Sequence, residues 1–229
     1  MKIGVIGDEP AGLILAKAWA GAGHDLIGVF VESPQAIERV EDLIPDVPIA
    51  PMAAVAEDAD LVVLSVPYKD IQLTCEGLSD LGVFGPRKII VQLSPHHGYS
   101  VLASAGRLGA IPVALHPVMH FTGTSMDLTV LKNTSVAVSA PEPLLPIAQA
   151  LAIELGSEPI VIQEEQRAAY SEAFDVASSF SSLVVKQAIG ILDQAGVESA
   201  ARLIAPVVRS AVESALHDPV AGLDPKDVL

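Results

Sequence analysis

Short apolar runs alternate with segments of helical periodicity from the first residues to about residue 162. Runs rich in β-branched residues predict strands at residues 2–6, 26–31, 47–49, 60–66, 88–93, 111–115, 134–139 and 159–162. Apolar residues at helical spacing predict helices at residues 12–22, 34–39, 52–57 and 144–155. This alternation predicts an α/β fold of Rossmann type, in which helices cover both faces of a mostly parallel sheet.

The pattern changes after residue 162, where strand signals stop and a long helical periodicity begins. Residues 164–195 predict one helix that Gly196 ends, and residues 198–216 predict a second helix that Pro206 kinks or breaks. We therefore expect a dinucleotide-binding-type Rossmann domain at residues 1–163 and a small all-helical dimerisation or substrate domain at residues 164–229. Because little chain is left to cover so long an apolar helix, a homodimer is favoured over packing against the first domain alone.

Composition and charge narrow the range of partners. The chain has 229 residues and a formal net charge of −15, from 28 acidic and 13 basic side chains. A field of this sign repels nucleic acid and anionic membranes, so neither is expected as a partner. The single cysteine, Cys75, excludes an internal disulfide and fits a reducing compartment. The amino terminus lacks the layout of a signal peptide, and no apolar run approaches the roughly 20 residues of a membrane span, so a cytoplasmic location is expected.

The loop after the first expected strand carries the candidate cofactor chemistry. A Rossmann first turn reads G-x-G-x-x-G, and residues 7–12 here read G-D-E-P-A-G, which retains Gly7 and Gly12. Glu9 replaces the glycine that lets the backbone approach a pyrophosphate, and Pro10 removes one N–H that would donate to it.

Electrostatics at this loop decide whether a cofactor binds. A carboxylate roughly 4 Å from a phosphate is repelled by about 4 kcal/mol at an effective dielectric constant near 20, whereas a helix N-terminus contributes only about 0.3–1 kcal/mol. If Glu9 points into the site, affinity falls about a thousandfold, and if it points outward the loss is smaller. A loop that keeps the fold and has lost the cofactor is the alternative.

Glu32 supports a cofactor. It ends the second expected strand, 20 positions after Gly12, where an acidic residue accepts hydrogen bonds from an adenosine ribose. Its charge would repel a 2′-phosphate, so NAD is favoured over NADP, and an ordinary solvated acid is the alternative. Ser33, which follows, is expected to cap the next helix and to border the cofactor.

Several short motifs suggest a family by their order and spacing. The glycine loop is followed by Leu64-Ser65-Val66-Pro67, Gln92-Leu93-Ser94, Leu115-His116-Pro117 and Ala169-Tyr170. On these motifs the chain resembles, from Lys2 to about Leu216, the uncharacterised Rossmann-like oxidoreductases related to pyrroline-5-carboxylate reductase and 6-phosphogluconate dehydrogenase. The resemblance implies an N-terminal cofactor domain and a C-terminal helical domain that often dimerises.

The resemblance also implies roles for individual residues. It places Val66, Pro67 and Tyr68 beside a nicotinamide, Ser94 near the substrate and His116 at the floor of the cleft. Ser94 and His116 are therefore the candidate catalytic residues. The chain departs from the family at Ser171, where relatives commonly carry a histidine, and residues 171–175 lack the lysine and asparagine of related hydroxyacid dehydrogenases. The expected general acid is thus missing from its usual place.

Four of the six histidines fall within 25 residues, namely His96, His97, His116 and His120. They follow strand ends, which places them at the carboxyl edge of the sheet, where open α/β folds bind ligands. Three roles stay open: acid–base or substrate contact, metal binding with a carboxylate such as Asp127, and loop packing. Because the spacing does not force these histidines onto one helix face, no metal ligand is assigned.

Two functions of different classes remain. One is an NAD(P)-dependent oxidoreductase acting on an unknown small molecule, which Glu32 and the strand-end motifs favour. The other is a cofactor-free binding or regulatory protein on a Rossmann scaffold, which Glu9, Pro10 and Ser171 favour. A metal-assisted enzyme is a third and weaker reading. The substitution Glu9→Gly separates the first two, because nucleotide affinity should rise by orders of magnitude if the loop is only blocked.

Overall fold

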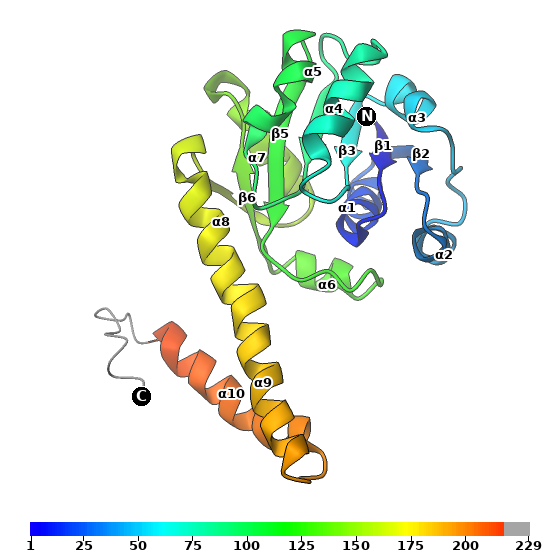
Figure 1. The fold of residues 1–229 in the computed structure, drawn as a ribbon. Helices are drawn as coiled ribbons and strands as arrows, with labels where there is room; N and C mark the ends of the chain where they lie inside the picture. Colours follow the sequence, from blue (N-terminus) through cyan, green and yellow to red (C-terminus); the bar gives the residue numbers. More distant parts are fainter. Residues whose placement is uncertain (218–229) are drawn as a thin grey trace. The chain divides into compact units, whose positions relative to one another are not determined.

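A single seven-stranded sheet organises the chain in the computed structural model, which describes residues 1–217 (Figure 1). Its strands lie in the order β2-β1-β3-β4-β5-β6-β7, and every neighbouring pair is parallel except β5 with β6. The strands are β1 (Lys2–Ile6), β2 (Asp25–Phe30), β3 (Leu61–Leu64), β4 (Ile89–Gln92), β5 (Ile111–Pro117), β6 (Ser135–Ser139) and β7 (Glu158–Val161). The expected α/β fold with a mostly parallel sheet is therefore confirmed.

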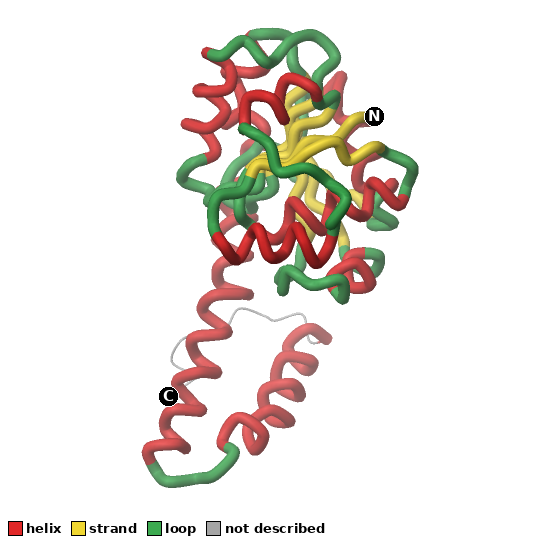
Figure 2. Tube along the Cα trace, turned by 90° about the vertical axis from the view of Figure 1, so that its right-hand side faces the viewer, coloured by secondary structure: helices red, strands yellow, loops and turns green. Residues whose placement is uncertain are grey.

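Helices cover both faces of this sheet, as Figure 2 shows with the strands in yellow between red helices. One face packs on α1 (Pro10–Gly21), α2 (Pro34–Leu43) and α7 (Leu145–Glu154), and the fully buried Trp19 lies in that core. The other face packs on α3 (Met52–Asp58), α4 (Ile71–Asp80) and α5 (Ala103–Arg107). Because both faces are covered, β3 is apolar and buried at all four positions.

The expected strands and helices are largely found, with shifted ends and two kinds of difference. Residues 47–49 form no strand, because only one isolated bridge joins Ile49 to Val29. A single bridge gives too few hydrogen bonds and too little packing to extend the sheet at that edge. Helices α4 and α5, and the short α6 (Asp127–Leu131), were not expected from the sequence, because polar and small residues interrupt their apolar spacing.

The long C-terminal helix is continuous but not uniform. It comprises α8 (Arg167–Asp175), a π-helical stretch (Val176–Phe180) and α9 (Ser181–Gln194), after a 3₁₀ turn at Glu164–Gln166. It ends as expected at Gly196, whose φ of +75° only glycine adopts without strain. The following helix α10 (Ala200–His217) runs through Pro206 without a break and lies beside α9 (Figure 2).

The described chain forms two compact units, Met1–Ser171 and a second unit that begins at Glu172. The division therefore follows the first turn of α8 rather than residue 163, where the domain boundary was expected. Residues 218–229 of the second expected domain lie outside the described part. Among the described residues, no helix is long and apolar enough to cross a membrane.

Candidate functional site

The glycine loop between β1 and α1 keeps the backbone shape of a dinucleotide-binding turn. Gly7 has a φ of +114°, and a Cβ added there would lie 2.3 Å from the carbonyl oxygen of Ser65. A Cβ added to Gly12 would lie 2.5 Å from Cβ of Ser65 and 2.9 Å from Val5. Both glycines are thus required by the close approach of α1 to the sheet, which the first and third glycines of the fingerprint serve.

Ser65, at the end of β3, ties the loop together. Its backbone oxygen accepts from the N–H of Glu9 at 2.9 Å, and its hydroxyl donates to the Glu9 carbonyl at 2.8 Å. The same hydroxyl accepts from the N–H of Gly12 at 2.9 Å. Because Pro10 has no N–H and that of Gly12 is engaged, Ala11 is the one of the first three residues of α1 whose N–H can serve a phosphate.

Glu9 is the N-cap of α1, and its side chain is exposed and makes no capping hydrogen bond. Its charge is therefore screened by water, and the repulsion of a phosphate roughly 4 Å away falls to about 1 kcal/mol. The two orientations of Glu9 considered from the sequence, into the site and outward, both stay predictions. The glycine loop thus keeps the backbone geometry of a dinucleotide-binding turn and carries one exposed negative charge at the start of α1.

Asp8 fills a role that the sequence analysis missed. Its carboxylate accepts from the backbone N–H groups of Glu32 and Ser33, both at 2.8 Å. Burial alone would raise the pKa of the Asp8 carboxyl, but the hydrogen bonds from Glu32 and Ser33 and the charge of Arg39 lower it overall. The carboxylate is therefore charged at neutral pH, at the end of β2, where an adenosine ribose binds in this fold.

Glu32 and Ser33 lie where the sequence placed them. Glu32 is exposed two residues after the end of β2, and Ser33 is the N-cap of α2, with its hydroxyl accepting from Ala36 N–H at 3.2 Å. Arg39, one turn further along α2, donates from Nη1 to the Asp8 carbonyl at 3.0 Å. This corner of the molecule thus gathers two acids, one cation and two backbone donors.

Val66, Pro67 and Tyr68 follow β3 at the same edge of the sheet. Val66 borders the glycine loop, since its Cγ1 would lie 2.6 Å from a Cβ on Gly7. The Tyr68 ring is 42% exposed, and its centroid lies 4.4 Å from that of the His96 ring. The backbone oxygen of Tyr68 is 2.9 Å from Nε2 of His97. These contacts join the β3 loop to the histidine-bearing loop that follows β4.

Gln92 shapes that second loop from within the core. Its side-chain oxygen accepts from Ser94 N–H at 2.7 Å, and its amide nitrogen donates to the carbonyl oxygens of Ser94 and His97. The Ser94 hydroxyl accepts from His96 N–H at 3.1 Å. Ser94 therefore stabilises the loop locally, and its proposed contact with a substrate stays a prediction.

A pair of side chains, the buried His116 and the half-buried Tyr170, lies on the sheet face beyond this loop. His116 on β5 is 6% exposed, and its Nδ1 lies 2.6 Å from the hydroxyl of Tyr170 on α8. Burial, with the charges of Arg167 and His96, lowers the pKa of His116 to about 3. Burial raises the pKa of Tyr170 to about 12, although Arg167 acts in the opposite direction. At neutral pH the histidine is thus neutral and the tyrosine keeps its proton.

Arg167 lies against the same pair, one turn before Tyr170 on α8. Its Cζ is 5.3 Å from the centroid of the Tyr170 ring, and its Nη2 donates to the Ser139 hydroxyl at 2.8 Å. Burial lowers the pKa of Arg167, while Glu164 and Tyr170 raise it. Arg167 is 6% exposed, and its buried Nε and Nη1 have no hydrogen-bond partner among the described residues. Buried donors without partners are rare, and they often occur where a protein keeps a charge for function.

The register of β5 and β6 explains why these groups meet. Ala114 pairs with Ser139 and His116 with Ala137, so alternation along the strands sends the side chains of His116 and Ser139 to the same face. Helix α8 then brings Tyr170 and Arg167 over that face. The sequence analysis used Tyr170 only as a family motif and did not consider Arg167, and no spacing signal marks either residue.

His96 and His120 have different surroundings. His96 reaches α8 as well, because its Nδ1 lies 2.7 Å from the Ser171 hydroxyl. An imidazole therefore stands next to position 171, where the family resemblance led us to expect one on the helix itself. His120 is exposed on the loop after β5.

The metal hypothesis finds no support among the described residues, where no group of three or more His, Cys, Asp or Glu is arranged to hold a metal. Asp127, suggested as a ligand, is 2% exposed, and its carboxylate accepts from the N–H groups of Thr122 and Gly123 and from the Thr122 hydroxyl. It stabilises the loop that leads into α6.

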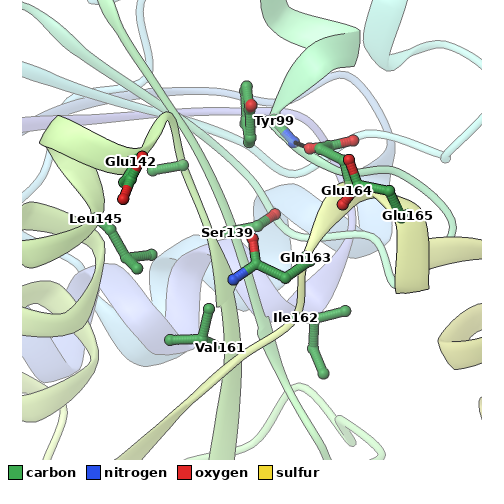
Figure 3. A pocket seen from close by; sticks show the side chains of 10 residues that line it. Tyr99, Ser139, Glu142, Leu145, Val161, Ile162, Gln163, Glu164 and Glu165 are labelled. Carbon is green, nitrogen blue, oxygen red and sulfur yellow. Dashed lines mark hydrogen bonds between the residues drawn. The ribbon is translucent and has the colours of Figure 1, made fainter.

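A cavity of about 330 Å³ lies next to Ser139. Figure 3 shows Ser139 and Gln163 close together, with Glu142 to one side and Glu164 and Glu165 to the other. None of the residues assigned to the site from the sequence lines this cavity. It is acidic, and two of its lining residues act on Arg167: Ser139 accepts a hydrogen bond from the guanidinium, and Glu164 interacts with it through its charge.

Comparison with known families finds two matches along the chain. Residues 1–117, half of the chain, match the Rossmann-like domain family. The chain belongs to the Rossmann-like domain family. Residues 134–223 of this Rossmann-like protein match a domain of unknown function, DUF2520. A comparison with curated proteins finds no match.

Solved structures share the fold over most of their length. A proposed NADP oxidoreductase from Bacteroides fragilis is 16% identical, with a TM-score of 0.77 and coverage of 100% of this chain and 83% of its own. Pyrroline-5-carboxylate reductase from Coxiella burnetii is 19% identical, with a TM-score of 0.63 and coverage of 96% and 81%. A semialdehyde dehydrogenase NAD-binding protein from Cupriavidus necator, solved with calcium and NAD, is 16% identical, with a TM-score of 0.66 and coverage of 97% and 86%. At these identities the likeness establishes the fold and not the activity.

Proposed function

We propose that this Rossmann-like protein is a nicotinamide-dependent oxidoreductase that reduces a carbonyl or imine of a small molecule. The observation that carries the proposal is the 2.6 Å hydrogen bond between the buried His116 and the half-buried Tyr170. Arg167 lies against this pair and keeps two buried donors without a partner among the described residues, as a site that holds a charge for function does. The fold and its NAD(P)-dependent neighbours support the same reading.

The proposed cofactor residues are those assigned from the sequence: Gly7, Glu9, Pro10, Gly12, Glu32, Ser33, Val66, Pro67 and Tyr68. The close approaches at Gly7 and Gly12 and the position of Ala11 at the start of α1 support a bound pyrophosphate. A bound nicotinamide supplies the hydride chemistry that side chains lack. The exposed charge of Glu9 weakens binding about fivefold by our estimate of about 1 kcal/mol.

Tyr170 is the proposed proton donor and His116 the residue that positions it. When the imidazole carries its proton on Nδ1, it donates to the Tyr170 oxygen and leaves the phenol O–H free for a substrate atom. The positive charge of Arg167 favours the phenolate that remains after transfer. This arrangement offers an acid at Tyr170 in place of the one missing from residues 171–175 of the same helix. It also assigns a role to the buried guanidinium of Arg167, which makes few hydrogen bonds. Ser94 stays a candidate for substrate contact.

Calorimetric titration with NADH and NADPH tests the cofactor. Micromolar binding to the natural protein supports the proposal, and Glu9→Gly should then raise affinity about fivefold because only a screened repulsion is removed. Binding that appears only in Glu9→Gly would mean a closed site on a Rossmann scaffold. Failure of both proteins to bind would favour the alternative function, a cofactor-free binding or regulatory protein, which the charges of Asp8 and Glu9 support.

We also propose that the C-terminal helices form a homodimer interface. Large apolar side chains stand exposed along α9 and α10, among them Leu183 at 61%, Leu203 at 60% and Val207 at 67%. Monomeric proteins seldom leave such a run of apolar surface in water. Sedimentation should find a dimer that Val207→Glu dissociates, whereas Leu73→Glu, at an equally exposed position on α4 (71%), leaves it intact. A monomeric natural protein at micromolar concentration would refute the proposal.

A further inference from the structure

The corner between β2 and α2 has the composition of a phosphate site, yet the chain fills it with its own anion. The N–H groups of Glu32 and Ser33 point to one spot, the first from the end of β2 and the second from the N-cap of α2. Arg39 adds a guanidinium on the next turn of the helix. Backbone donors, a helix N-terminus and an arginine are the groups that bind phosphate in proteins.

The occupant of this corner is the Asp8 carboxylate. Each of its two oxygens accepts one N–H at 2.8 Å, Oδ1 from Glu32 and Oδ2 from Ser33. Asp8 is half-buried, so its charge is less screened than that of an exposed acid. An incoming phosphate would have to replace a carboxylate that is already fully paired with backbone donors.

We propose that Asp8 is the residue that sets cofactor specificity, because its carboxylate occupies the subsite of the adenosine 2′-phosphate and thereby excludes NADP. This inference rests on the proposed nicotinamide-dependent function and goes beyond it. In this fold the end of β2 meets the adenosine 2′-oxygen, and a nearby arginine accommodates a 2′-phosphate when one is present. Arg39 stands in that place but faces Asp8.

The same geometry changes the expected role of Glu32. From the sequence, the Glu32 carboxylate was the group that repels a 2′-phosphate. In the structure its side chain is exposed and its backbone N–H is the group in the subsite. Discrimination by Asp8 and discrimination by Glu32 therefore make opposite predictions for single substitutions at the two positions.

The test compares affinities for NADH, NADPH and the fragment adenosine 2′,5′-bisphosphate, measured by calorimetry on the natural protein and on Asp8→Ala, Asp8→Asn and Glu32→Gln. The natural protein should prefer NADH at least tenfold. Asp8→Ala should raise affinity for NADPH and for the fragment at least tenfold, since the two N–H groups lose their anion and the positive charge of Arg39 is no longer offset by the Asp8 carboxylate. Glu32→Gln should change the preference less than threefold. Urea unfolding followed by Trp19 fluorescence checks that each variant is folded, and Asp8→Asn removes the charge with the least change of shape.

The outcomes distinguish a failure of this inference from a failure of the proposed nicotinamide-dependent function. The role of Asp8 would be overturned if Asp8→Ala and Asp8→Asn are both folded and bind NADPH and the fragment no better than the natural protein does. A preference that follows Glu32→Gln instead would also overturn it. If no variant binds either dinucleotide but Asp8→Ala gains the fragment tenfold, the proposed oxidoreductase fails while the assignment of the phosphate subsite stands.

Discussion

Burial of His116 should make the stability of the first unit depend on pH in a way that one substitution removes. The pKa of His116 falls from an ordinary 6.5 to about 3, because burial, Arg167 and His96 disfavour the imidazolium. The folded protein therefore keeps this histidine neutral at a pH where the unfolded chain protonates it. The contribution is fully present above pH 6.5 and is lost as pH falls from 6.5 to about 3.

The magnitude follows from linkage. Each unit of pKa difference corresponds to about 1.4 kcal/mol, so the whole effect is on the order of 5 kcal/mol by pH 3. Between pH 7 and pH 5, above the range in which most carboxylates titrate, the loss from His116 alone is about 2 kcal/mol. The substitution His116→Gln keeps a hydrogen-bonding group near Tyr170 and removes the titration, so this part of the pH dependence should disappear.

Urea unfolding at pH 7 and pH 5, followed by tryptophan fluorescence, measures the difference. Trp19 is the one tryptophan of the chain, is fully buried and donates to the Leu151 carbonyl at 2.9 Å, so its emission reports on the first unit. The natural protein should lose about 2 kcal/mol more than His116→Gln over this interval. His217→Gln, on an exposed side of α10, is the matched control for loss of an imidazole. Equal pH dependence in the natural protein and His116→Gln would refute the reasoning.

Three further predictions concern residues that stabilise the loops and helix starts around the candidate site. Gly12→Ala should lower the free energy of unfolding by about 1–3 kcal/mol, because its Cβ would lie 2.5 Å from Cβ of Ser65. Gly21→Ala is the control and should not lower it, because nothing lies within 4 Å of a Cβ there. The midpoints of urea unfolding measure both changes. Ser33→Ala should cost about 1 kcal/mol in the same assay, since the N-cap bond to α2 is lost, and Ser33→Gly should cost less. Asp127→Ala should cost about 1–3 kcal/mol by leaving the donors of its loop unpaired; a change below 0.5 kcal/mol would show that water replaces the carboxylate.

Much of the fold can be predicted from local pattern, because the spacing of apolar residues within a short segment differs between strands and helices. The strands expected at residues 2–6 and 134–139 and the helix expected at residues 12–22 are found nearly in place, as β1, β6 and α1. The strand expected at residues 47–49 was wrong, since a strand also needs a neighbour with which to share hydrogen bonds. The antiparallel pairing of β5 and β6 was equally outside the reach of local pattern, because direction in a sheet depends on the whole path of the chain.

The sequence by itself determined the class of fold and the loop that could hold a cofactor. Gly7 and Gly12 mark the turn by type and spacing alone, because each meets a steric limit that only glycine satisfies. Only the tertiary structure decided which charges face that site. The contact of Asp8 with Glu32 spans 24 residues, and that of His116 with Tyr170 spans 54. Such contacts arise from the packing of α2 and α8 against the sheet, so spacing along the chain carries no signal of them.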